Sequence, residues 1–229
     1  MMNKERVLLL GIESSGLTSA ISVGDGTELL GEIRLNKAHV HSKRMPVMLS
    51  QLLEHLDLAI ENLSGIVLSA GPGSFTGLRI GYSLAKGLAH ASGLPIVEVP
   101  TLDVWALQSG EKEKTVLPVI DAHRGELFTA KYRLNGDSLD RLTEFELMEI
   151  NNLLEWLDEP VTITGGDAAK LAEKLINTGI PAGSILPPPN AMPESWALLK
   201  IGMKKYAAGE FADMAHCEPM YLRAFKGVM

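Results

Sequence analysis

Residues 6–35 read RVLLLGIESSGLTSAISVGDGTELLGEIRL, and they carry the first fold prediction. RVLLLGIE (6–13) is a buried-strand pattern that ends in a carboxylate, and LTSAISVG (17–24) predicts a second strand. GDG (24–26) is typical of a hairpin turn, and TELLGEIRL (27–35) predicts a third strand. We therefore expect three strands in succession, the last two joined by a hairpin.

The same order of elements returns about 110 residues later. TVLPVID (115–121) predicts a buried strand that again ends in a carboxylate, and GELFTAKYRL (125–134) predicts the strand after it. NGD (135–137) is a turn, and SLDRLTEFEL (138–147) follows it. Element order and turn chemistry repeat with little residue identity. Duplication is the favoured interpretation, and chance recurrence is the alternative.

Each strand triplet is followed by an amphipathic helix, a short strand and a glycine-rich entry to another helix. The helices are expected at 43–58 and 150–158, and the glycine-rich entries are GIVLSAGPGSFTG (65–77) and VTITGGDAAK (161–170). A doubled βββαβα unit is the organisation shared by actin, the Hsp70 ATPase domain and the sugar kinases. We therefore predict an α/β fold of the actin-like (ASKHA) class, with two lobes built on mixed sheets.

The polar segment SGEKEK (109–114) is the expected linker between the lobes. An N-terminal lobe would then cover residues 1–108 and a C-terminal lobe residues 109–229. PPPNAMP (187–193) predicts an extended loop before the last long helix, at about 193–208. That helix is expected to cross back toward the first lobe.

Composition excludes several classes of protein. Of the 229 residues, 46% are apolar and 21% are charged, which is ordinary for a globular chain. The single cysteine, the short apolar run near the start and the absence of a membrane-length apolar stretch predict a soluble, cytoplasmic protein. The formal charge of -7 argues against a broad nucleic-acid surface, so RNA would be held mainly by a partner.

Several motifs together resemble the bacterial TsaB (YeaZ) family. They are GIESSGLTSAISV (11–23), HSKRMPVMLSQLLE (41–54), AGPGSFTGLRIGYSLAKGLA (70–89), VIDAHRGELF (119–128) and YLR (221–223). The resemblance implies a non-catalytic subunit of the complex that makes threonylcarbamoyladenosine next to the tRNA anticodon. It implies pairing with the catalytic paralogue TsaD, cooperation with the P-loop ATPase TsaE, and contact with tRNA only through the complex.

An enzyme remains the alternative: a self-standing nucleotide-dependent phosphotransferase or hydrolase of this superfamily, formerly labelled a glycoprotease. Leu17 and Thr18 stand where TsaD-like proteins carry two acidic residues, and Thr101 and Trp105 stand where they carry two metal-binding histidines. No metal site or catalytic residue is expected. We expect no cofactor in the isolated chain, with ATP or ADP only at the interface of the complex.

The glycine-rich stretch at 70–93 does not match a P-loop, because Leu78 and Arg79 stand where Lys and Ser would follow Gly77. Two interpretations stay open: a packing joint, which is favoured, or an anion contact at a helix start that Ser74 or Thr76 caps. For Glu13, a carboxylate held by turn amides is favoured over a ligand. The candidate anion or nucleotide contacts are Glu13, Ser15, Gly71, Gly73 and Ser74.

Two helices, expected at 43–57 and about 76–92, carry more apolar residues than one buried stripe can hold. In the second, Gly81, Ala85 and Ala89 recur at a spacing that would let another helix approach closely. We therefore predict an isologous homodimer of the isolated chain and TsaD binding on the same patch. The candidate partner-binding residues are Met45, Met48, Leu49, Leu52, Leu56, Leu78, Tyr82, Ala85 and Ala89.

Overall fold

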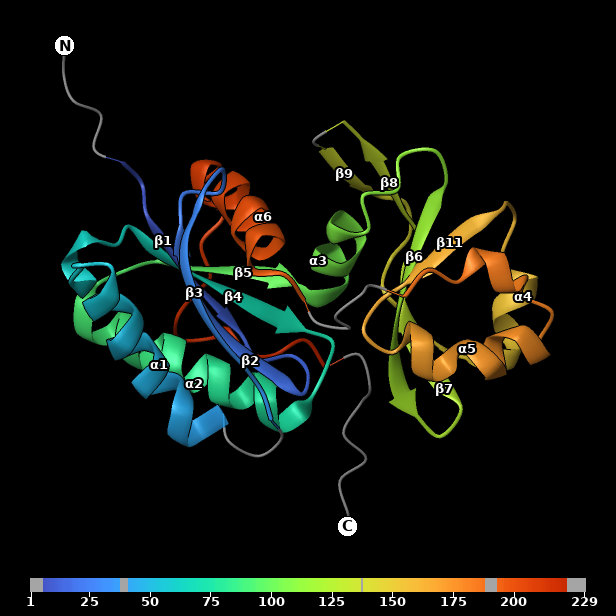
Figure 1. Cartoon of the computed structure of the whole chain (residues 1–229), viewed down its shortest axis with the longest axis horizontal. Coiled ribbons are helices and arrows are strands. Elements are labelled where there is room, and N and C mark those ends of the chain that lie inside the picture. The colour runs from blue at the N-terminus through green and yellow to red at the C-terminus, as the bar shows by residue number, and fades with distance from the viewer. Residues whose placement is uncertain (1–5, 38–40, 137, 188–192, 222–229) are drawn as a thin grey trace. The chain divides into compact units, whose positions relative to one another are not determined.

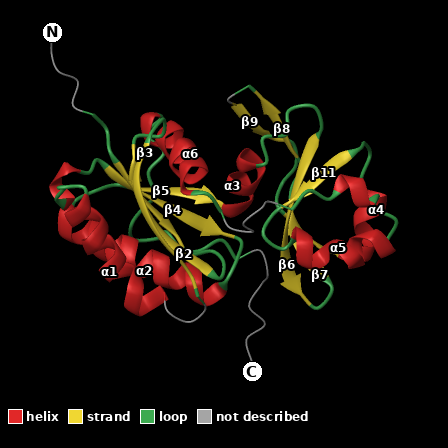
Figure 2. Ribbon diagram, viewed as in Figure 1, coloured by secondary structure: helices red, strands yellow, loops and turns green. Residues whose placement is uncertain are grey.

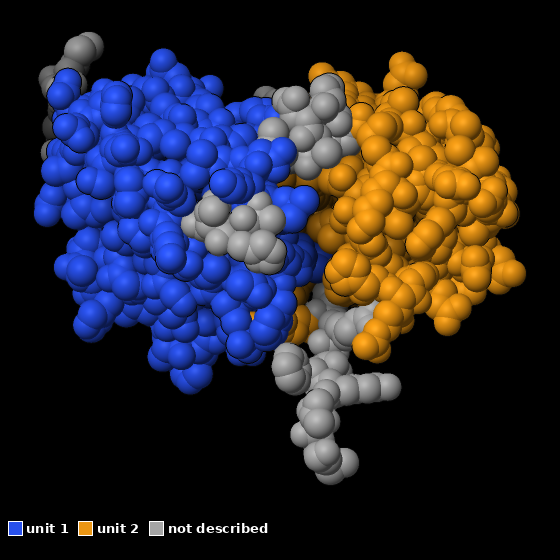
Figure 3. Space-filling model, turned by 60° about the horizontal axis from the view of Figure 1, so that its bottom comes forward, with its two compact units in different colours: residues 1–100, 194–219 blue, residues 101–193, 220–229 orange. Residues whose placement is uncertain are grey.

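The computed structural model describes residues 6–37, 41–136, 138–187 and 193–221. The chain forms two compact units, the first made of residues 1–100 with 194–219, and the second of residues 101–193 with 220–229 (Figure 3). Each unit has its own sheet, in agreement with the two predicted lobes.

The sheet of unit 1 has five strands in the order β3-β2-β1-β4-β5. Strands are yellow and helices red in Figure 2. The strands are β1 (Leu9–Glu13), β2 (Thr18–Gly24), β3 (Leu29–Asn36), β4 (Gly65–Gly71) and β5 (Ile96–Pro100). The first three are antiparallel neighbours, and β4 and β5 continue the sheet in parallel. The predicted hairpin turn forms because Asp25 Oδ1 accepts the N–H groups of Thr27 and Glu28, at 3.0 and 2.9 Å.

Helices cover both faces of this sheet. The helices α1 (His41–His55) and α2 (Phe75–Ser92) lie on one face and α6 (Ser195–Ala207) on the other (Figure 1), and a short 3-10 helix, η1 (Ile60–Asn62), follows α1. Successive residues of a strand point to opposite faces of the sheet, so neighbouring residues of β1 contact different helices. Leu10 and Ile12 belong to the core under α1 and α2, while Gly11 faces Leu199 of α6.

The sheet of unit 2 repeats this topology with broken strands. Its strands are β6 (Thr115–His123), β7 (Glu126–Thr129), β8 (Tyr132–Asn135), β9 (Ser138–Arg141), β10 (Glu146–Glu149) and β11 (Val161–Thr164). The long β6 pairs antiparallel with β7 and then β8, and parallel with β11, as β1 pairs with β2 and β4. The order of pairing confirms the duplicated unit.

The two predicted strands at 125–134 and 138–147 are each divided in two. The first break falls at Lys131, whose N–H donates to Thr143 Oγ1 at 3.0 Å instead of joining a ladder. The Lys131 side chain is buried, and its Nζ binds the carbonyl oxygen of Trp156 at 3.0 Å and Asp158 at 2.6 Å. Because these hydrogen bonds hold Lys131 outside the sheet, the strand is interrupted between β7 and β8.

The helices of unit 2 are α3 (Thr101–Gln108), α4 (Leu153–Trp156) and α5 (Ala168–Asn177), with the 3-10 helices η2 (Ile150–Asn152) and η3 (Ala182–Ser184). The helix expected at 150–158 is only η2 followed by the single turn of α4. None of the helices in the described residues is long and apolar enough to cross a membrane.

The division between units lies at residue 100, not at the expected residue 108, and 194–219 belongs to unit 1. The first difference arises because α3 packs on β6, and Tyr132 Oη donates to Asp103 Oδ1 at 2.7 Å. Residues 194–219 belong to unit 1 because α6 packs on β1, β4 and β5. This is the return to the first lobe that was expected for the last long helix. The middle of the predicted loop, residues 188–192, lies outside the described residues.

Candidate functional site

The glycine-rich turn at the start of α2 is bound to the β1–β2 loop (residues 14–17). Ser74 is the N-cap of α2, and its Oγ accepts the N–H of Gly77 at 3.2 Å. The Ser74 N–H donates to the carbonyl oxygen of Ser15 at 2.6 Å. Two amides at the start of the helix are thus satisfied by the chain itself.

Three glycines at a spacing of four residues explain the close contact. A Cβ atom added at Gly73, Gly77 or Gly81 would come within 3.0 Å of a β1–β2 loop atom. Those atoms are the carbonyl oxygens of Ser15 and Ser14 and the Oγ of Ser14. We call Gly73, Gly77 and Gly81 the glycine track, since the loop packs directly against these three residues, which have no side chains of their own.

Glu13, at the end of β1, holds the loop from beneath. Its side chain is 1% exposed, and Oε1 accepts the N–H of Ser15 at 2.6 Å and the hydroxyl of Ser15 at 2.5 Å. Burial raises the pKa of the Glu13 carboxyl above its ordinary 4.5, although the Ser15 hydrogen bonds act in the opposite direction. One turn amide and one hydroxyl, both of Ser15, thus hold this carboxyl through Oε1, and Oε2 has no hydrogen-bond partner among the described residues.

The candidate anion residues Glu13, Ser15, Gly73 and Ser74 therefore do come together, with Gly71 ending β4 just before them. Their geometry does not fit a nucleotide phosphate. The Ser74 and Gly77 amides already have partners, the β1–β2 loop covers the glycine track, and a buried carboxyl stands beside it. These contacts favour the packing joint.

The corresponding hairpin of unit 2, between β6 and β7, has a different backbone. His123, Arg124 and Gly125 all have left-handed φ values, of 65°, 57° and 82°. The His123 side chain is 81% exposed, so it projects from the turn. Two bulky residues therefore occupy backbone positions that usually take glycine or asparagine.

A carboxylate also lies near the end of β6, two residues before its last residue. Asp121 Oδ1 accepts the N–H of His123 at 2.8 Å, and its Oδ2 pairs with Lys170 Nζ at 2.6 Å. The Asp121 N–H donates to Asp167 Oδ2 at 2.9 Å, at the start of α5. Burial alone would raise the pKa of Asp121, but the bonds from Lys170 and His123 outweigh it and lower that pKa below 3.8.

The two positions where TsaD-like proteins carry histidines lie in α3. Thr101 is 1% exposed and Trp105 is 3% exposed, so both side chains lie in the interior. Within the described ranges, no group of three or more histidine, cysteine, aspartate or glutamate residues is placed to hold a metal ion.

The predicted partner-binding residues are not on the surface. Eight of them, all except Leu56, are at most 7% exposed within the chain, and Leu56 is partly buried against the same core. The prediction assumed one buried face for each helix, but α1 packs on β2 and β3 and also on α2. Leu52 and Leu56 lie over Gly31 of β3, while Ala85 and Ala89 belong to the unit's own core.

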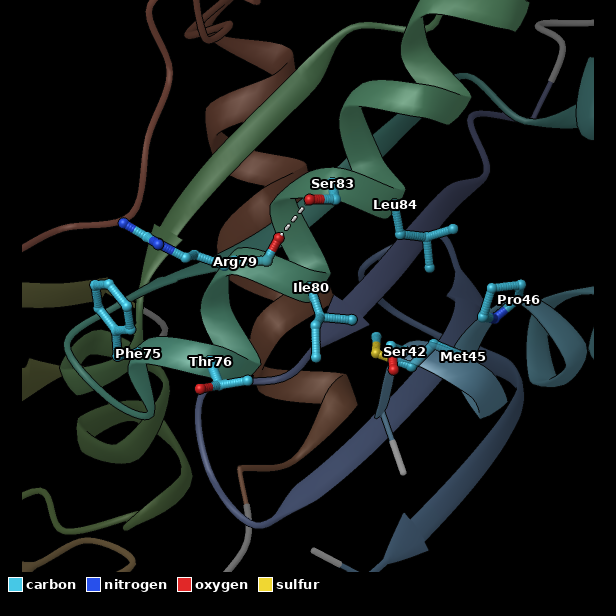
Figure 4. A pocket seen from close by; sticks show the side chains of 9 residues that line it. All are labelled: Ser42, Met45, Pro46, Phe75, Thr76, Arg79, Ile80, Ser83 and Leu84. Carbon is cyan, nitrogen blue, oxygen red and sulfur yellow. Dashed lines mark hydrogen bonds between the residues drawn. The ribbon is translucent and has the colours of Figure 1, made fainter. Parts of the chain in front are cut away.

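A groove between α1 and α2 provides exposed surface on the same helices. It has a volume of about 590 Å³ and is lined by Ser42, Met45, Pro46, Phe75, Thr76, Arg79, Ile80, Ser83 and Leu84 (Figure 4). Ile80 and Leu84 point from α2 toward α1, and the guanidinium of Arg79 lies 3.9 Å from the centre of the Phe75 ring. We call this the α1–α2 groove.

Of the nine lining residues, only Met45 was among the predicted contacts. The stripe of α2 chosen from the sequence, which includes Leu78, Tyr82 and Ala85, points inward. The neighbouring stripe of Thr76, Ile80 and Leu84 has the same helical spacing and faces the groove. That spacing is the signal that could have found the groove.

Comparisons with known proteins agree with this structure. The family model described as TsaD, tRNA N6-adenosine threonylcarbamoyltransferase, matches residues 28–216. The chain is 30% identical to the tRNA threonylcarbamoyladenosine biosynthesis protein TsaB of Bacillus subtilis (strain 168), over 94% of this chain and 93% of the relative. It is 29% identical to TsaB of Escherichia coli (strain K12), over 80% of each chain.

Among solved structures, an uncharacterized protein from Pseudomonas aeruginosa with similarity to peptidase YEAZ has a TM-score of 0.82. It is 21% identical and covers 95% of this chain and all of that one, so it supports the fold alone. With the duplicated topology described above, it confirms the predicted actin-like fold class. The chain itself matches the TsaD family model, and it belongs to the TsaB (YeaZ) family.

Proposed function

We propose that this chain is a non-catalytic binding subunit in tRNA threonylcarbamoyladenosine biosynthesis, and that it activates a TsaD-like threonylcarbamoyltransferase by docking with it. The biosynthetic role is supported by the named TsaB relatives that align over most of the chain. The observation that supports a docking role is the α1–α2 groove.

The chemistry of the groove suits a partner helix. Pro46, Ile80 and Leu84 supply apolar surface above the buried Met45, and hydroxyl side chains border it. With 18 residues, α2 is about 27 Å long, enough to support a helix laid alongside it. We assign the TsaD-like subunit to this groove in the complex and a second copy of the chain when the partner is absent, so that the two assemblies exclude each other.

The remaining partners follow from the same proposal. A TsaE-like ATPase would join the complex, tRNA would be held mainly by the other subunits, and ATP or ADP would bind at an interface of the complex. The packing joint argues only against a phosphate site at the start of α2, because the β1–β2 loop covers that place. Equilibrium binding of ATP by the isolated chain and by the complex tests the nucleotide assignment.

Ser83→Arg tests the docking surface. Ser83 is exposed on α2 and lines the groove, so the substitution places a charged side chain there with little effect on the core. We expect loss of the homodimer in sedimentation analysis and loss of modification by the reconstituted complex. The matched control is Asn177→Arg, the same charge change at an exposed position of α5. Both associations persisting in a folded Ser83→Arg variant would contradict the docking surface.

Turnover separates the proposal from the enzyme alternative. A self-standing phosphotransferase or hydrolase would consume ATP with magnesium when alone. We expect no turnover by the isolated chain, and modification of tRNA only when the TsaD-like and TsaE-like subunits are added. The proposal would be overturned if the isolated chain turned over ATP and the Ser83→Arg variant did so at the same rate.

A further inference from the structure

We propose that Glu13 is a positioning residue, which acts through Ser15 and Ser74 to set the start of α2 and thereby the shape of the α1–α2 groove. The inference rests on the proposed function where it concerns the partner. Its local part, the order of the first turns of α2, concerns this chain alone.

A continuous series of short hydrogen bonds carries the inference. Glu13 Oε1 binds both the N–H and the hydroxyl of Ser15, and the Ser15 carbonyl oxygen accepts the N–H of Ser74. The residues that follow the Ser74 cap, Phe75 and Thr76, line the groove. Two hydrogen-bonded links therefore separate the buried carboxyl from the docking surface.

Burial makes these bonds hard to replace. Glu13 and Ser15 are 1% and 4% exposed, so removal of the carboxyl would leave the Ser15 N–H and hydroxyl in the interior without their protein acceptor. The β1–β2 loop would have to move to satisfy them. Because its backbone rests on the glycine track, its movement would also remove the partner of the Ser74 N–H.

The role requires an acceptor at Oε1 and does not require a charge. A glutamine fills the same volume and can accept both Ser15 hydrogen bonds through its amide oxygen. Its NH2 group would replace Oε2, which has no hydrogen-bond partner among the described residues, so the substitution costs global stability but keeps the Ser15 contacts. A ligand for a metal or a cationic group would instead need the carboxylate, and Glu13→Gln would then fail as Glu13→Ala does. The pair Glu13→Gln and Glu13→Ala therefore separates positioning from ligand binding.

The first arm of the test is amide hydrogen exchange over residues 74–80 in the isolated chain. We expect faster exchange there in Glu13→Ala and wild-type protection in Glu13→Gln. Leu199→Ala is the control, because Leu199 belongs to α6 and is buried against the other face of the sheet. It should lower global stability without a selective effect on the start of α2. Equal effects of Leu199→Ala and Glu13→Ala on that segment would overturn the inference.

The second arm is the affinity for the TsaD-like subunit, measured where all variants are folded. If Glu13→Ala leaves the competent groove populated about one-tenth of the time, affinity falls about tenfold. Glu13→Gln and Leu199→Ala should stay within about twofold of wild type. If Glu13→Ala does not fold, Ser15→Ala replaces it in the test. This variant loses the hydroxyl bond and keeps the N–H bond to Glu13, so we expect a smaller increase in exchange and a smaller loss of affinity.

The outcomes of the two arms are distinguishable. If wild type does not bind the TsaD-like subunit, the proposed function fails, and the exchange data alone decide whether Glu13 orders α2. If the partner binds but Glu13→Ala and Glu13→Gln weaken binding equally, the carboxylate charge matters and the positioning role is overturned. Wild-type affinity in a folded Glu13→Ala variant also overturns it.

Discussion

Each copy of the fold carries a carboxyl side chain near the end of its first strand: Glu13 ends β1, and Asp121 lies two residues before the end of β6. Glu13 accepts the N–H of Ser15, two residues on, at 2.6 Å, and Asp121 accepts the N–H of His123, also two residues on, at 2.8 Å. The start of the following helix is tied to the same place, through Ser74 in unit 1 and Asp167 in unit 2. Both copies therefore tie a helix start to this place, by a backbone–backbone bond in unit 1 and by the Asp167 side chain in unit 2.

The electrostatic environment of the joint is not preserved. Glu13 is buried under a loop that lies on the glycine track, and burial raises its pKa. Asp121 pairs with Lys170, whose side chain is 59% exposed, and the pKa of Asp121 is lowered. One joint depends on close packing and the other on hydrogen bonds at a wetter surface. Substitutions should therefore have their largest effects in unit 1.

The largest expected effect is that of Gly77→Ala. A Cβ atom there would collide with the carbonyl oxygen of Ser14, a backbone atom that cannot swing aside. We expect the free energy of unfolding to fall by about 3 kcal/mol or more, measured by urea denaturation. The control is Gly87→Ala on the exposed side of the same helix, where an added Cβ meets no atom within 4 Å. It should be stabilising by about 0.5–1 kcal/mol.

Asp121→Ala should have a smaller effect in unit 2. It removes the acceptor of the His123 N–H and the partner of Lys170, for an expected loss of about 1–2 kcal/mol in the free energy of unfolding. Lys170→Met, which removes only the exposed ion pair, should cost less than about 1 kcal/mol. If the two variants lost equal stability, the Asp121–Lys170 ion pair would account for the whole effect. The hydrogen bond from the His123 N–H would then contribute nothing measurable.

The opposite pKa shifts predict opposite pH dependence. The pKa of Glu13 is raised in the folded state, so its contribution to stability is full below about pH 4.5 and is lost as pH rises through the folded pKa. The pKa of Asp121 is lowered, so its contribution is present above about pH 3.8 and is lost as pH falls through the folded pKa.

Urea denaturation from pH 3 to pH 8 measures both effects. Relative to Glu13→Gln, wild type should be most stable at the acid end of this range and lose that advantage toward neutral pH. Relative to Asp121→Asn, wild type should lose its advantage toward the acid end. If the free energy of unfolding changed with pH in the same way in wild type and in both variants, the two carboxyls would not have opposite pKa shifts.

Much of the fold could be predicted because its signals are local. The GDG turn, the apolar strand runs and the Ser74 cap each depend on a few neighbouring residues, and the structure confirms them. The break at Lys131 could not be predicted in this way, because it depends on Thr143 and on Trp156, 12 and 25 residues away.

The candidate site shows the same limit. Apolar periodicity identified α1 and α2 as helices with an excess of apolar residues, but it does not say which surface covers them. Leu52 and Leu56 are covered by Gly31 of β3, a contact that only the folded sheet defines. Equally, the glycines of the 70–93 stretch favoured a joint, but only the structure shows that the β1–β2 loop is the other half of it.

The smallest expected effect concerns the turn that follows Asp121. Arg124 has a φ of 57°, a left-handed conformation that costs a residue with a Cβ about 1–2 kcal/mol and costs glycine almost nothing. Because glycine also gains freedom in the unfolded chain, Arg124→Gly should raise the free energy of unfolding by only about 0.5–1 kcal/mol. Arg124→Ala keeps the unfavourable backbone and should give no gain. The difference between these two variants isolates the backbone cost of the β6–β7 turn, and no difference in urea denaturation would mean that the turn is unstrained.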